Sequence, residues 1–287
     1  MIGVVAGITQ INCVITKAAN CCLAGWLVVQ CIMESTMLAQ EYCRRITECI
    51  DTIRNTQMDA ITKAAEEIAS RLEKGGLFYV FGTGHSHMLA EELYHRAGGL
   101  IQARAIVPHE ITVDLCNRKS TLMERLDGVA EVIFATHKIR SCDVLILVSN
   151  SGRNPVPVQM AKIARERGIF TVALTNLAHS KAVNSREKTG KRLFELCDMV
   201  LDTCGPSGDA IVPIPGRDYS MAPSSTILGA MILQSLVCAI VETMISHGHE
   251  PLIRRSVNLD GNDDHNQKIK AQLLETFPGI KEVLTFF

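Results

Sequence analysis

Two loops, each directly after an apolar run, carry the residue types best suited to binding an anion. The first is Phe81-Gly82-Thr83-Gly84-His85-Ser86-His87, and the second is Ser149-Asn150-Ser151-Gly152-Arg153-Asn154-Pro155. Glycine lets the backbone approach a ligand closely, hydroxyls donate hydrogen bonds, and the N-terminus of a following helix presents N–H groups to an anion. The loops therefore predict a phosphate site that needs no metal. Its predicted binding residues are Gly82, Thr83, Gly84, His85, Ser86, Ser149, Asn150, Ser151, Gly152, Arg153 and Asn154.

A dinucleotide site explains these loops less well. Gly82-x-Gly84 begins a dinucleotide fingerprint, but that fingerprint needs a third glycine where the chain has His87. It also needs an acid about 20 residues further on, to which Pro108-His109-Glu110 is a poor match. The second loop would stay unexplained. The chain has no G-x-x-x-x-G-K-[ST] motif, which excludes a P-loop.

The same residue types could instead cap a helix or bind a metal. Ser149 and Asn154 could merely cap the helix after the second loop, but capping needs only one of them, so the cluster favours a ligand. His85-x-His87 could begin a zinc site, yet no convincing third and fourth ligand follow. The acids within 258–266 lack the spacing of a calcium loop. We therefore predict no metal and no cofactor.

The apolar pattern predicts elements that bring the two loops together. A helical pattern covers 34–74, and further helical patterns at 88–97, 122–137, 156–167 and 191–197 separate five short apolar runs. Strands alternating with helices predict an α/β fold, with a parallel sheet covered by helices on both faces. Ligands in such folds bind at the carboxyl ends of the strands, where both loops lie. The predicted strands are Leu77–Phe81, Ala103–Val107, Val144–Val148, Phe170–Leu174 and Met199–Leu201.

A structured loop and one very apolar helix follow the fifth strand. Residues 204–223 are rich in glycine and proline, and the helix at 224–246 is almost wholly apolar from Ile227 to Ile240. A helix that is apolar on all sides is either buried in a soluble protein or spans a membrane. Its polar residues Gln234, Ser235 and Glu242 favour the buried helix.

Composition limits the classes of function. The chain has 287 residues, 47% of them hydrophobic and 21% charged, with a net charge of −1. Proteins that bind nucleic acid are usually basic, so we expect no nucleic-acid partner. The eleven cysteines are odd in number and form no C-x-x-C pair. They predict reduced thiols and a cytoplasmic protein rather than a disulfide framework.

The first 32 residues differ from the rest, with four of the eleven cysteines and a single charge, Lys17. We expect residues 1–32 to be a poorly structured extension. A membrane or targeting segment would also fit there, but Lys17, Asn20 and Gln30 interrupt its most apolar window.

Taken together, several motifs resemble the sugar isomerase (SIS) domain family, whose members bind phosphorylated sugars. The chain is similar, from residue 33 onward, to an uncharacterised branch related to phosphoheptose isomerases and N-acetylmuramic acid 6-phosphate etherases. The motifs are the first loop with Ala90-Glu91-Glu92, the second loop, Thr171–Asn176, Gly208-Asp209-Ala210, Ile214-Pro215-Gly216, Pro223–Thr226 and Asn258-Leu259-Asp260-Gly261.

The resemblance implies a flavodoxin-like three-layer α/β/α sandwich with a five-stranded parallel sheet. It also implies a homodimer or higher homo-oligomer, with a phosphosugar site often shared between subunits. We expect an N-terminal helical segment at 33–76, the SIS domain at 77–250 and a C-terminal tail with a short helix at 251–287.

Three residues are candidates for the chemistry, namely Glu92, Glu124 and His179. Isomerisation of a phosphosugar and elimination from it both begin when a base, within about 3 Å, removes the proton next to the open-chain carbonyl. Relatives carry a glutamate on the helix after the first loop, but about one turn beyond Glu92, near Arg96. Glu124 resembles a second acid of the etherases. Glu92 could instead be a solvated surface acid, and Thr121-x-x-Glu124 could be a capping box.

Two functions remain open. The protein could be an enzyme that acts on a sugar 6-phosphate, either an isomerase or a lyase of the etherase or dehydratase type. Two acids facing the pocket would favour the lyase. It could instead be a non-catalytic phosphosugar sensor or regulatory subunit, although no helix-turn-helix is recognisable and the chain is not basic.

Overall fold

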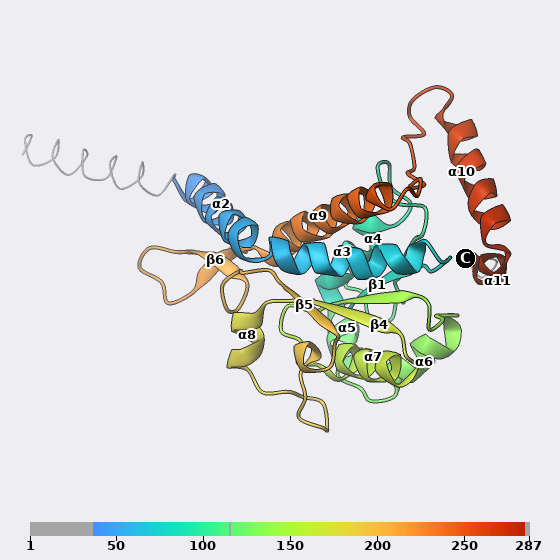
Figure 1. The fold of residues 1–287 in the computed structure, drawn as a ribbon. Coiled ribbons are helices and arrows are strands. Elements are labelled where there is room, and N and C mark those ends of the chain that lie inside the picture. The colour runs from blue at the N-terminus through green and yellow to red at the C-terminus, as the bar shows by residue number, and fades with distance from the viewer. Residues whose placement is uncertain (1–36, 115, 285–287) are drawn as a thin grey trace, which may run out of the picture.

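A central sheet of five parallel strands organises the protein. The computed structural model describes residues 37–114 and 116–284, and the strands lie in the order β2-β1-β3-β4-β5 (Figure 1). All four pairings between neighbours are parallel. The predicted five-stranded parallel sheet is therefore confirmed. The strands are β1 Phe78–Gly82, β2 Ala103–Ile106, β3 Val144–Val148, β4 Phe170–Thr175 and β5 Met199–Asp202.

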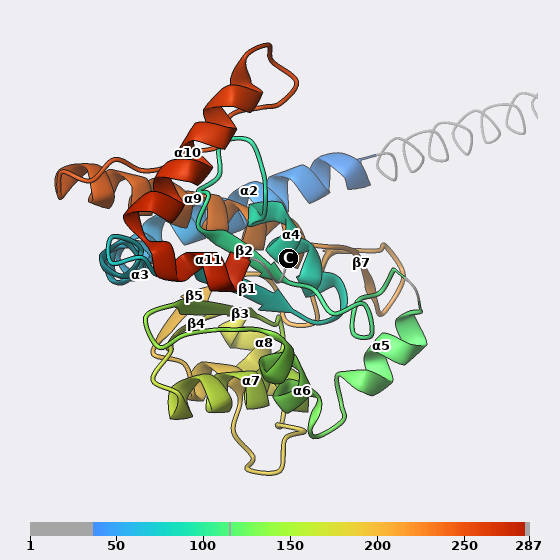
Figure 2. The ribbon, with the colours of Figure 1, turned by 90° about the vertical axis from the view of Figure 1, so that its right-hand side faces the viewer.

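Helices cover both faces of the sheet, which confirms the three-layer α/β/α sandwich (Figures 1 and 2). Alternate strand residues point to opposite faces. Phe78, Val80 and Ile146 accordingly join the core under α3 Met58–Leu72, α4 His87–Leu93 and α9 Ser225–Ser246. Tyr79 and Phe81 join the core against α6 Val129–Thr136 and α7 Pro155–Glu166. The central strands β1 and β3 are buried along their whole length, and all their residues except the terminal Gly82 are large and hydrophobic.

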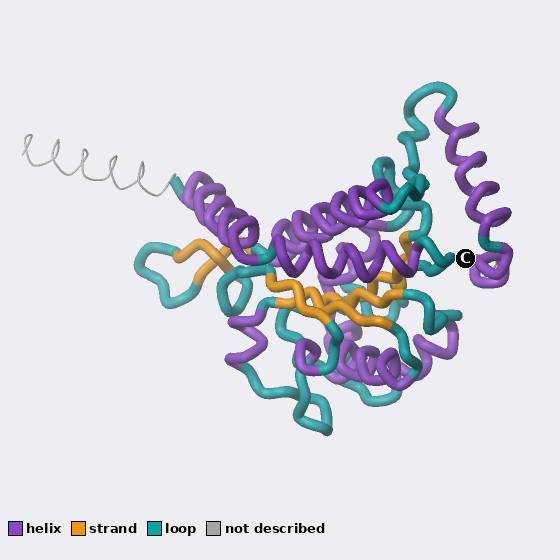
Figure 3. The backbone as a smooth tube through the Cα atoms, in the orientation of Figure 1, coloured by secondary structure: helices purple, strands orange, loops and turns teal. Residues whose placement is uncertain are grey.

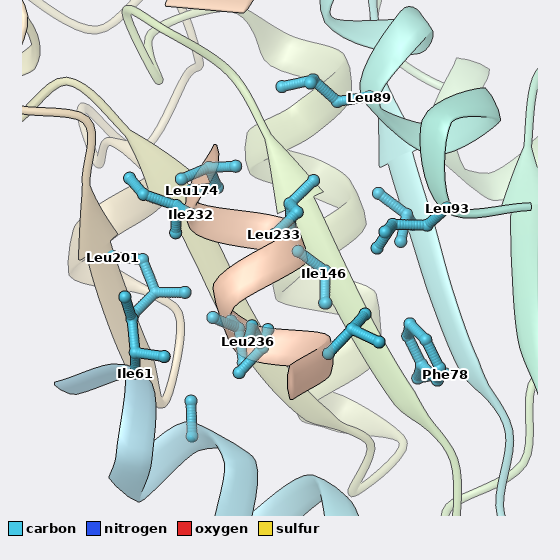
Figure 4. Packing of buried hydrophobic residues seen from close by; sticks show 14 of the residues in the cluster. Ile61, Phe78, Leu89, Leu93, Ile146, Leu174, Leu201, Ile232, Leu233 and Leu236 are labelled. Carbon is cyan, nitrogen blue, oxygen red and sulfur yellow. The ribbon is translucent and has the colours of Figure 1, made fainter. Parts of the chain in front are cut away.

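Helix α9 lies at the centre of the core that contains Phe78, Val80 and Ile146. Its residues Ile232, Leu233 and Leu236 lie against the sheet residues Ile146 and Leu174 (Figure 4). Among the described residues, α9 is the one helix long and apolar enough to cross a membrane. A core helix of a soluble protein has the same composition, so this is weak evidence for a membrane span.

Several elements differ from the predicted ones. The helical pattern at 34–74 forms two helices, α2 Leu38–Thr56 and α3, and the pattern at 122–137 is divided into α5 Asn117–Met123 and α6 by the left-handed Gly128. Only a 3₁₀ turn, η2 Leu193–Glu195, forms at 191–197.

The short helix α8 Leu177–Ala182 and the hairpin β6 Ala210–Pro213 with β7 Ser220–Pro223 were not predicted. The hairpin projects beside α2 (Figure 3), where the Tyr42 hydroxyl donates to the carbonyl of Pro223.

The C-terminal tail contains a longer helix than expected. Helix α10 Asn262–Thr276 begins inside the polar run 258–266, and η3 Pro278–Ile280 and α11 Lys281–Leu284 follow it. This tail packs against the core that contains Tyr79 and Phe81, through Ile269, Leu273 and Ile280. The predicted extension at 1–32 lies outside the described residues. The described cysteines form no disulfide with one another, and the reduced state of their thiols stays a prediction; they are Cys43, Cys49, Cys116, Cys142, Cys197, Cys204 and Cys238.

Candidate functional site at the carboxyl edge of the sheet

The sheet brings the two predicted loops side by side. Gly82, the last residue of β1, pairs with Val148, the last residue of β3, so that Thr83 and Ser149 leave the sheet next to each other. A small cavity of about 20 Å³ lies at this edge. Its polar lining comes from Ser86 of the first loop, Asn150 of the second, Thr203 after β5, and Ser225 and Thr226 of α9. We call this region the edge site.

Two buried polar atoms without a partner, in Asn150 and Thr203, belong to residues that line the edge site. In the described part of the chain, five buried side-chain nitrogen or oxygen atoms lack a hydrogen-bond partner. Four of them, in Asn150, Arg153, Ser180 and Thr203, belong to segments that follow β3, β4 or β5. Buried polar atoms are nearly always hydrogen-bonded in proteins, so Asn150 and Thr203 offer groups that a polar ligand or a water molecule at the edge site could satisfy.

The first loop holds its hydroxyl groups in place by short-range contacts. Gly82 is required, because a Cβ there would lie 2.5 Å from the carbonyl oxygen of Ser86. The N–H of Gly84 donates to the carbonyl of Ile111, and the N–H of Ser86 donates to that of Thr83. These two N–H groups are therefore already hydrogen-bonded within the protein. The hydroxyl of Ser86 has no partner among the described residues and stays available to a ligand.

The second loop turns tightly before α7. The left-handed Gly152, with φ +56°, donates its N–H to the Ser149 hydroxyl at 3.2 Å. Asn154 occupies the N-cap position of α7, but its side chain makes no capping bond and instead accepts from Arg186 at 2.9 Å. The interpretation of Ser149 and Asn154 as simple helix caps is therefore wrong. Within the described residues, the Ser151 hydroxyl is free of hydrogen bonds.

Positive charge surrounds the second loop. The main-chain N–H of Arg186 donates to the carbonyl of Arg153 at 2.8 Å, which places the two arginines together. Burial lowers the pKa of Arg186, as do the charges of Arg125 and Arg153, whereas Glu124 opposes that effect. Like charges this close destabilise one another, and an anionic ligand would relieve that repulsion.

Glu124 is the predicted catalytic residue that the structure brings to the loops. Its Oε2 accepts a 2.8 Å hydrogen bond from the buried Thr83 hydroxyl, and its main-chain oxygen accepts from the N–H of Val156 in α7 at 3.2 Å. The capping-box interpretation of Glu124 is wrong. Helix α5 begins at Asn117, so Thr121 lies inside it and Glu124 follows its last turn.

Glu92 and His179 lie outside the edge site. Glu92 on α4 accepts from Arg96 at 2.5 Å and from Gln234 of α9 at 3.1 Å. The ring Nδ1 of His179 on α8 accepts from the N–H of Gly208 at 3.3 Å and lies 3.1 Å from the Ser207 hydroxyl. Neither side chain contacts a residue of the two loops among its hydrogen bonds, and the catalytic role of each stays a prediction.

The histidines of the first loop have different surroundings. His85 is exposed, whereas the ring of buried His87 contacts the carbonyl of Gly84 in the turn before α4. Across residues 37–114 and 116–284, no three histidine, cysteine or acidic side chains lie close enough to hold a metal ion. The absence of a metal or cofactor in the working protein stays a prediction.

Sequence reasoning missed three residues of this region: Thr203, Ser180 and Arg186. Thr203 directly follows β5 just as Ser149 follows β3, so its position was a usable signal. Asp209, of the Gly208-Asp209-Ala210 motif, accepts hydrogen bonds from the main-chain N–H groups of Ser224 and Ser225 at the start of α9. Ser180 and Arg186 reach the second loop only through tertiary packing, which no local pattern records.

Residues 41–176 match the model of the SIS domain family, with which the parallel sheet and its two strand-end loops agree. The chain is 40% identical to a UPF0309 protein of Halalkalibacterium halodurans, over 80% of this chain and 95% of the relative. It is 35% identical to a UPF0309 protein of Geobacillus kaustophilus, over 85% of this chain and 98% of the relative. The chain therefore belongs to the UPF0309 family.

Among solved structures, a phosphoheptose isomerase of Francisella tularensis aligns with 71% of this chain and 96% of its own, at 19% identity and a TM-score of 0.47.

Proposed function

We propose that the edge site binds the phosphate of a sugar phosphate and that the protein isomerises this sugar through an enediolate. The observation that carries the proposal is that the second loop, which holds the unpartnered buried atoms of Asn150 and Arg153, leaves the sheet next to Thr83, whose hydroxyl donates to Glu124. Anion-binding groups and a carboxylate thus lie at one edge of the sheet. An open-chain sugar phosphate needs both.

The phosphate is assigned to the second loop. Ser151 offers a free hydroxyl, and α7, a helix of 12 residues, begins at Pro155 directly after the loop. The positive end of a helix dipole stabilises a phosphate at such a position. The N–H groups of Val156 and Val158 are already hydrogen-bonded, and Pro155 and Pro157 have none, so the helix contributes through its dipole. Arg153 and Arg186 add charge, and the buried Nε of Arg153 has no partner in the described chain.

Glu124 is the best-placed base. In the proposed reaction its carboxylate removes the proton from C2 of the open-chain aldose, and the electrons of that C–H bond form the C1=C2 double bond of the enediolate while the C1 carbonyl oxygen takes the negative charge. A proton then passes from the C2 hydroxyl to the neighbouring O1, Glu124 returns its proton to C1, and C2 becomes the carbonyl carbon of the ketose. The Thr83 hydroxyl fixes the orientation of the carboxylate throughout both proton transfers.

Isomerisation is favoured over elimination because one acid, not two, lies beside the loops. Elimination benefits from a second acid that protonates the leaving group. Glu92 is held by Arg96 and Gln234 instead. The lyase reaction would require Glu92 to leave both partners.

The size of the cavity supports a shared site. At about 20 Å³ it holds about one water molecule, so a sugar bound by the loops must extend outward from the edge. We propose that a second copy of the chain covers the sugar in a cytoplasmic homodimer. Light scattering of the purified protein should give the mass of a dimer or a higher oligomer, and a monomer would contradict this proposal.

The function is tested by incubating the purified protein with a panel of sugar 6-phosphates in heavy water and following them by NMR. An isomerase incorporates solvent deuterium at C2 and yields the ketose or aldose partner. Appearance of an unsaturated product would identify a lyase. Binding of a sugar phosphate without exchange or turnover across the panel would identify the sensor instead.

A further inference from the structure

A second cavity, of about 220 Å³, lies at the opposite end of α4 from the first loop. The first loop precedes the N-terminus of α4, whereas His95 and Arg96 of this cavity follow its C-terminus. The other wall comes from the start of the C-terminal tail, between α9 and α10 (Figure 1). We call it the tail cavity; its polar lining includes His95, Arg96, Arg254, Arg255, Ser256 and Asn258.

Main-chain hydrogen bonds fix the two walls together. The N–H of Gly98 donates to the carbonyl of Arg254 at 2.8 Å, and the N–H of Arg254 donates to that of Gly99 at 2.9 Å. The Asn266 side chain bonds both the N–H and the carbonyl of Arg255, at 2.9 Å each. His95 adopts the left-handed backbone conformation, with φ 50°, which is strained for a residue with a side chain. The arginine side chains therefore project from a backbone that is already ordered.

The tail cavity carries positive charge without a matching acid. Among the described residues that line it, none is aspartate or glutamate. Arg96 forms an ion pair with Glu92, with 2.5 Å between the charged atoms. Neither Arg254 nor Arg255 forms an ion pair within the described chain. Burial lowers the pKa of Arg254, and burial followed by the Arg254 charge lowers the pKa of His95. Arg254 is half-buried, and a charge taken out of water is stabilised by a partner of opposite sign.

We propose that the tail cavity binds a phosphate dianion, either free inorganic phosphate or a small phosphate monoester, at a site separate from the edge site. Arg254 and Arg255 supply the charge, and the Ser256 and Asn258 side chains supply further hydrogen-bonding groups. Asn258 begins the Asn258-Leu259-Asp260-Gly261 motif, which the edge site does not use. The site gives that motif a role that does not depend on the proposed reaction.

Titration calorimetry at constant ionic strength tests the tail cavity. Because the edge site is also proposed to bind phosphate, the parent protein for the titration is the double variant Ser149→Ala/Ser151→Ala. Inorganic phosphate and glycerol 3-phosphate are titrated separately, and whichever binds more tightly identifies the form of the ligand. We expect saturable binding to this parent. Adding Arg254→Gln and Arg255→Gln should weaken that binding by about 10-fold or more for each arginine.

The matched control is Arg217→Gln, which removes an exposed arginine in the β6–β7 turn and should leave the affinity unchanged. Should the double arginine variant fail to fold, Arg255→Gln alone serves, because Arg255 is exposed and Asn266 holds its backbone. No phosphate binding to the parent, or unchanged affinity after Arg255→Gln, would overturn the proposal. Failure of the edge site would appear separately, as unchanged sugar phosphate binding in Ser149→Ala/Ser151→Ala.

Discussion

The Thr83 hydroxyl donates a 2.8 Å hydrogen bond to Oε2 of Glu124, which lies 41 residues further along the chain. The main-chain oxygen of the same glutamate accepts from Val156, in the first turn of α7. Glu124 is thus attached to both strand-end loops, through its side chain to the first loop and through its backbone to the helix that follows the second. This double attachment distinguishes it from the other candidate bases, Glu92 and His179.

Replacing Thr83 by valine should slow the proposed reaction while preserving the fold. The substitution keeps the shape of the side chain but removes the donor to Glu124, and a hydrogen bond to a charged group contributes about 1.5–3 kcal/mol. We expect at least a 10-fold lower rate of deuterium exchange at C2, measured by NMR with the sugar 6-phosphate that the panel selects. Thr83→Ser retains the hydroxyl and should restore most of the rate. Equal rates in Thr83→Val and the unmodified protein would show that this bond has no catalytic role.

Replacing Gly152 by alanine should destabilise the second loop. Gly152 has φ +56°, and a Cβ would lie 3.1 Å from the Ser180 hydroxyl and 3.2 Å from Cβ of Leu193. Conformational strain and crowding together predict a loss of about 1–3 kcal/mol in the free energy of unfolding, measured with urea.

Gly190→Ala is the control for this substitution. Gly190 also has a positive φ, +73°, but open space surrounds its Cβ position, so only the conformational part of the loss should appear. Equal losses in the two variants would mean that crowding around Gly152 is unimportant.

Removing the buried carboxylate of Asp143 should be among the most destabilising single changes. Asp143 is 0% exposed, accepts from the N–H of Leu77 at 2.8 Å and pairs with Arg140 at 2.6 Å, so it joins the starts of β1 and β3. Breaking a buried ion pair on one side costs about 3–5 kcal/mol. We expect Asp143→Ala to lower the free energy of unfolding by that amount. The control Asp218→Ala changes an exposed residue and should leave the free energy of unfolding nearly unchanged. Similar stability of the two variants would contradict the role of Asp143 in joining the two strands.

Stability should fall at alkaline pH because of Cys197. Burial raises the pKa of this thiol from its ordinary value of 9.0 to about 12. Between those two values the unfolded chain has released the proton and the folded chain has kept it, so unfolding releases a proton and rising pH favours it. Below pH 9 the thiol is neutral in both states, and its full contribution to stability is present.

The free energy of unfolding should therefore fall more steeply with pH in the unmodified protein than in Cys197→Ala. The difference in slope above pH 9 should approach about 1.4 kcal/mol per pH unit. Parallel curves for the two proteins between pH 8 and about 11 would show that the folded thiol titrates normally.

The sheet could be predicted because its signal is local. The central strands are buried on both faces, so Val144–Val148 and Phe78–Phe81 are continuous apolar runs, and the polar loops mark their ends. The positions of the catalytic candidates could not be predicted in the same way. Thr121-x-x-Glu124 matches a capping box, but helix α5 starts at Asn117 and leaves Glu124 free to reach Thr83.

The surroundings of Glu92 and Arg186 depend on contacts between distant segments. Gln234, which bonds Glu92, lies 142 residues away in sequence, on a helix whose orientation follows from the whole core. Arg186 reaches Asn154 because the long segment after α8 folds back over the second loop. Neither contact leaves a periodic or spaced pattern in the sequence.

The most direct measurement compares Glu124→Gln with Glu131→Gln for binding of the selected sugar 6-phosphate and for deuterium exchange at its C2. Glu131 is an exposed acid in the first turn of α6, so its substitution controls for the loss of one surface charge. If Glu124 is the base, Glu124→Gln should retain binding, because an amide still accepts from Thr83, while exchange falls by roughly 100-fold or more. Glu131→Gln should exchange at the unmodified rate. Undiminished exchange in Glu124→Gln would contradict the assignment of the catalytic base and, with it, the proposed mechanism.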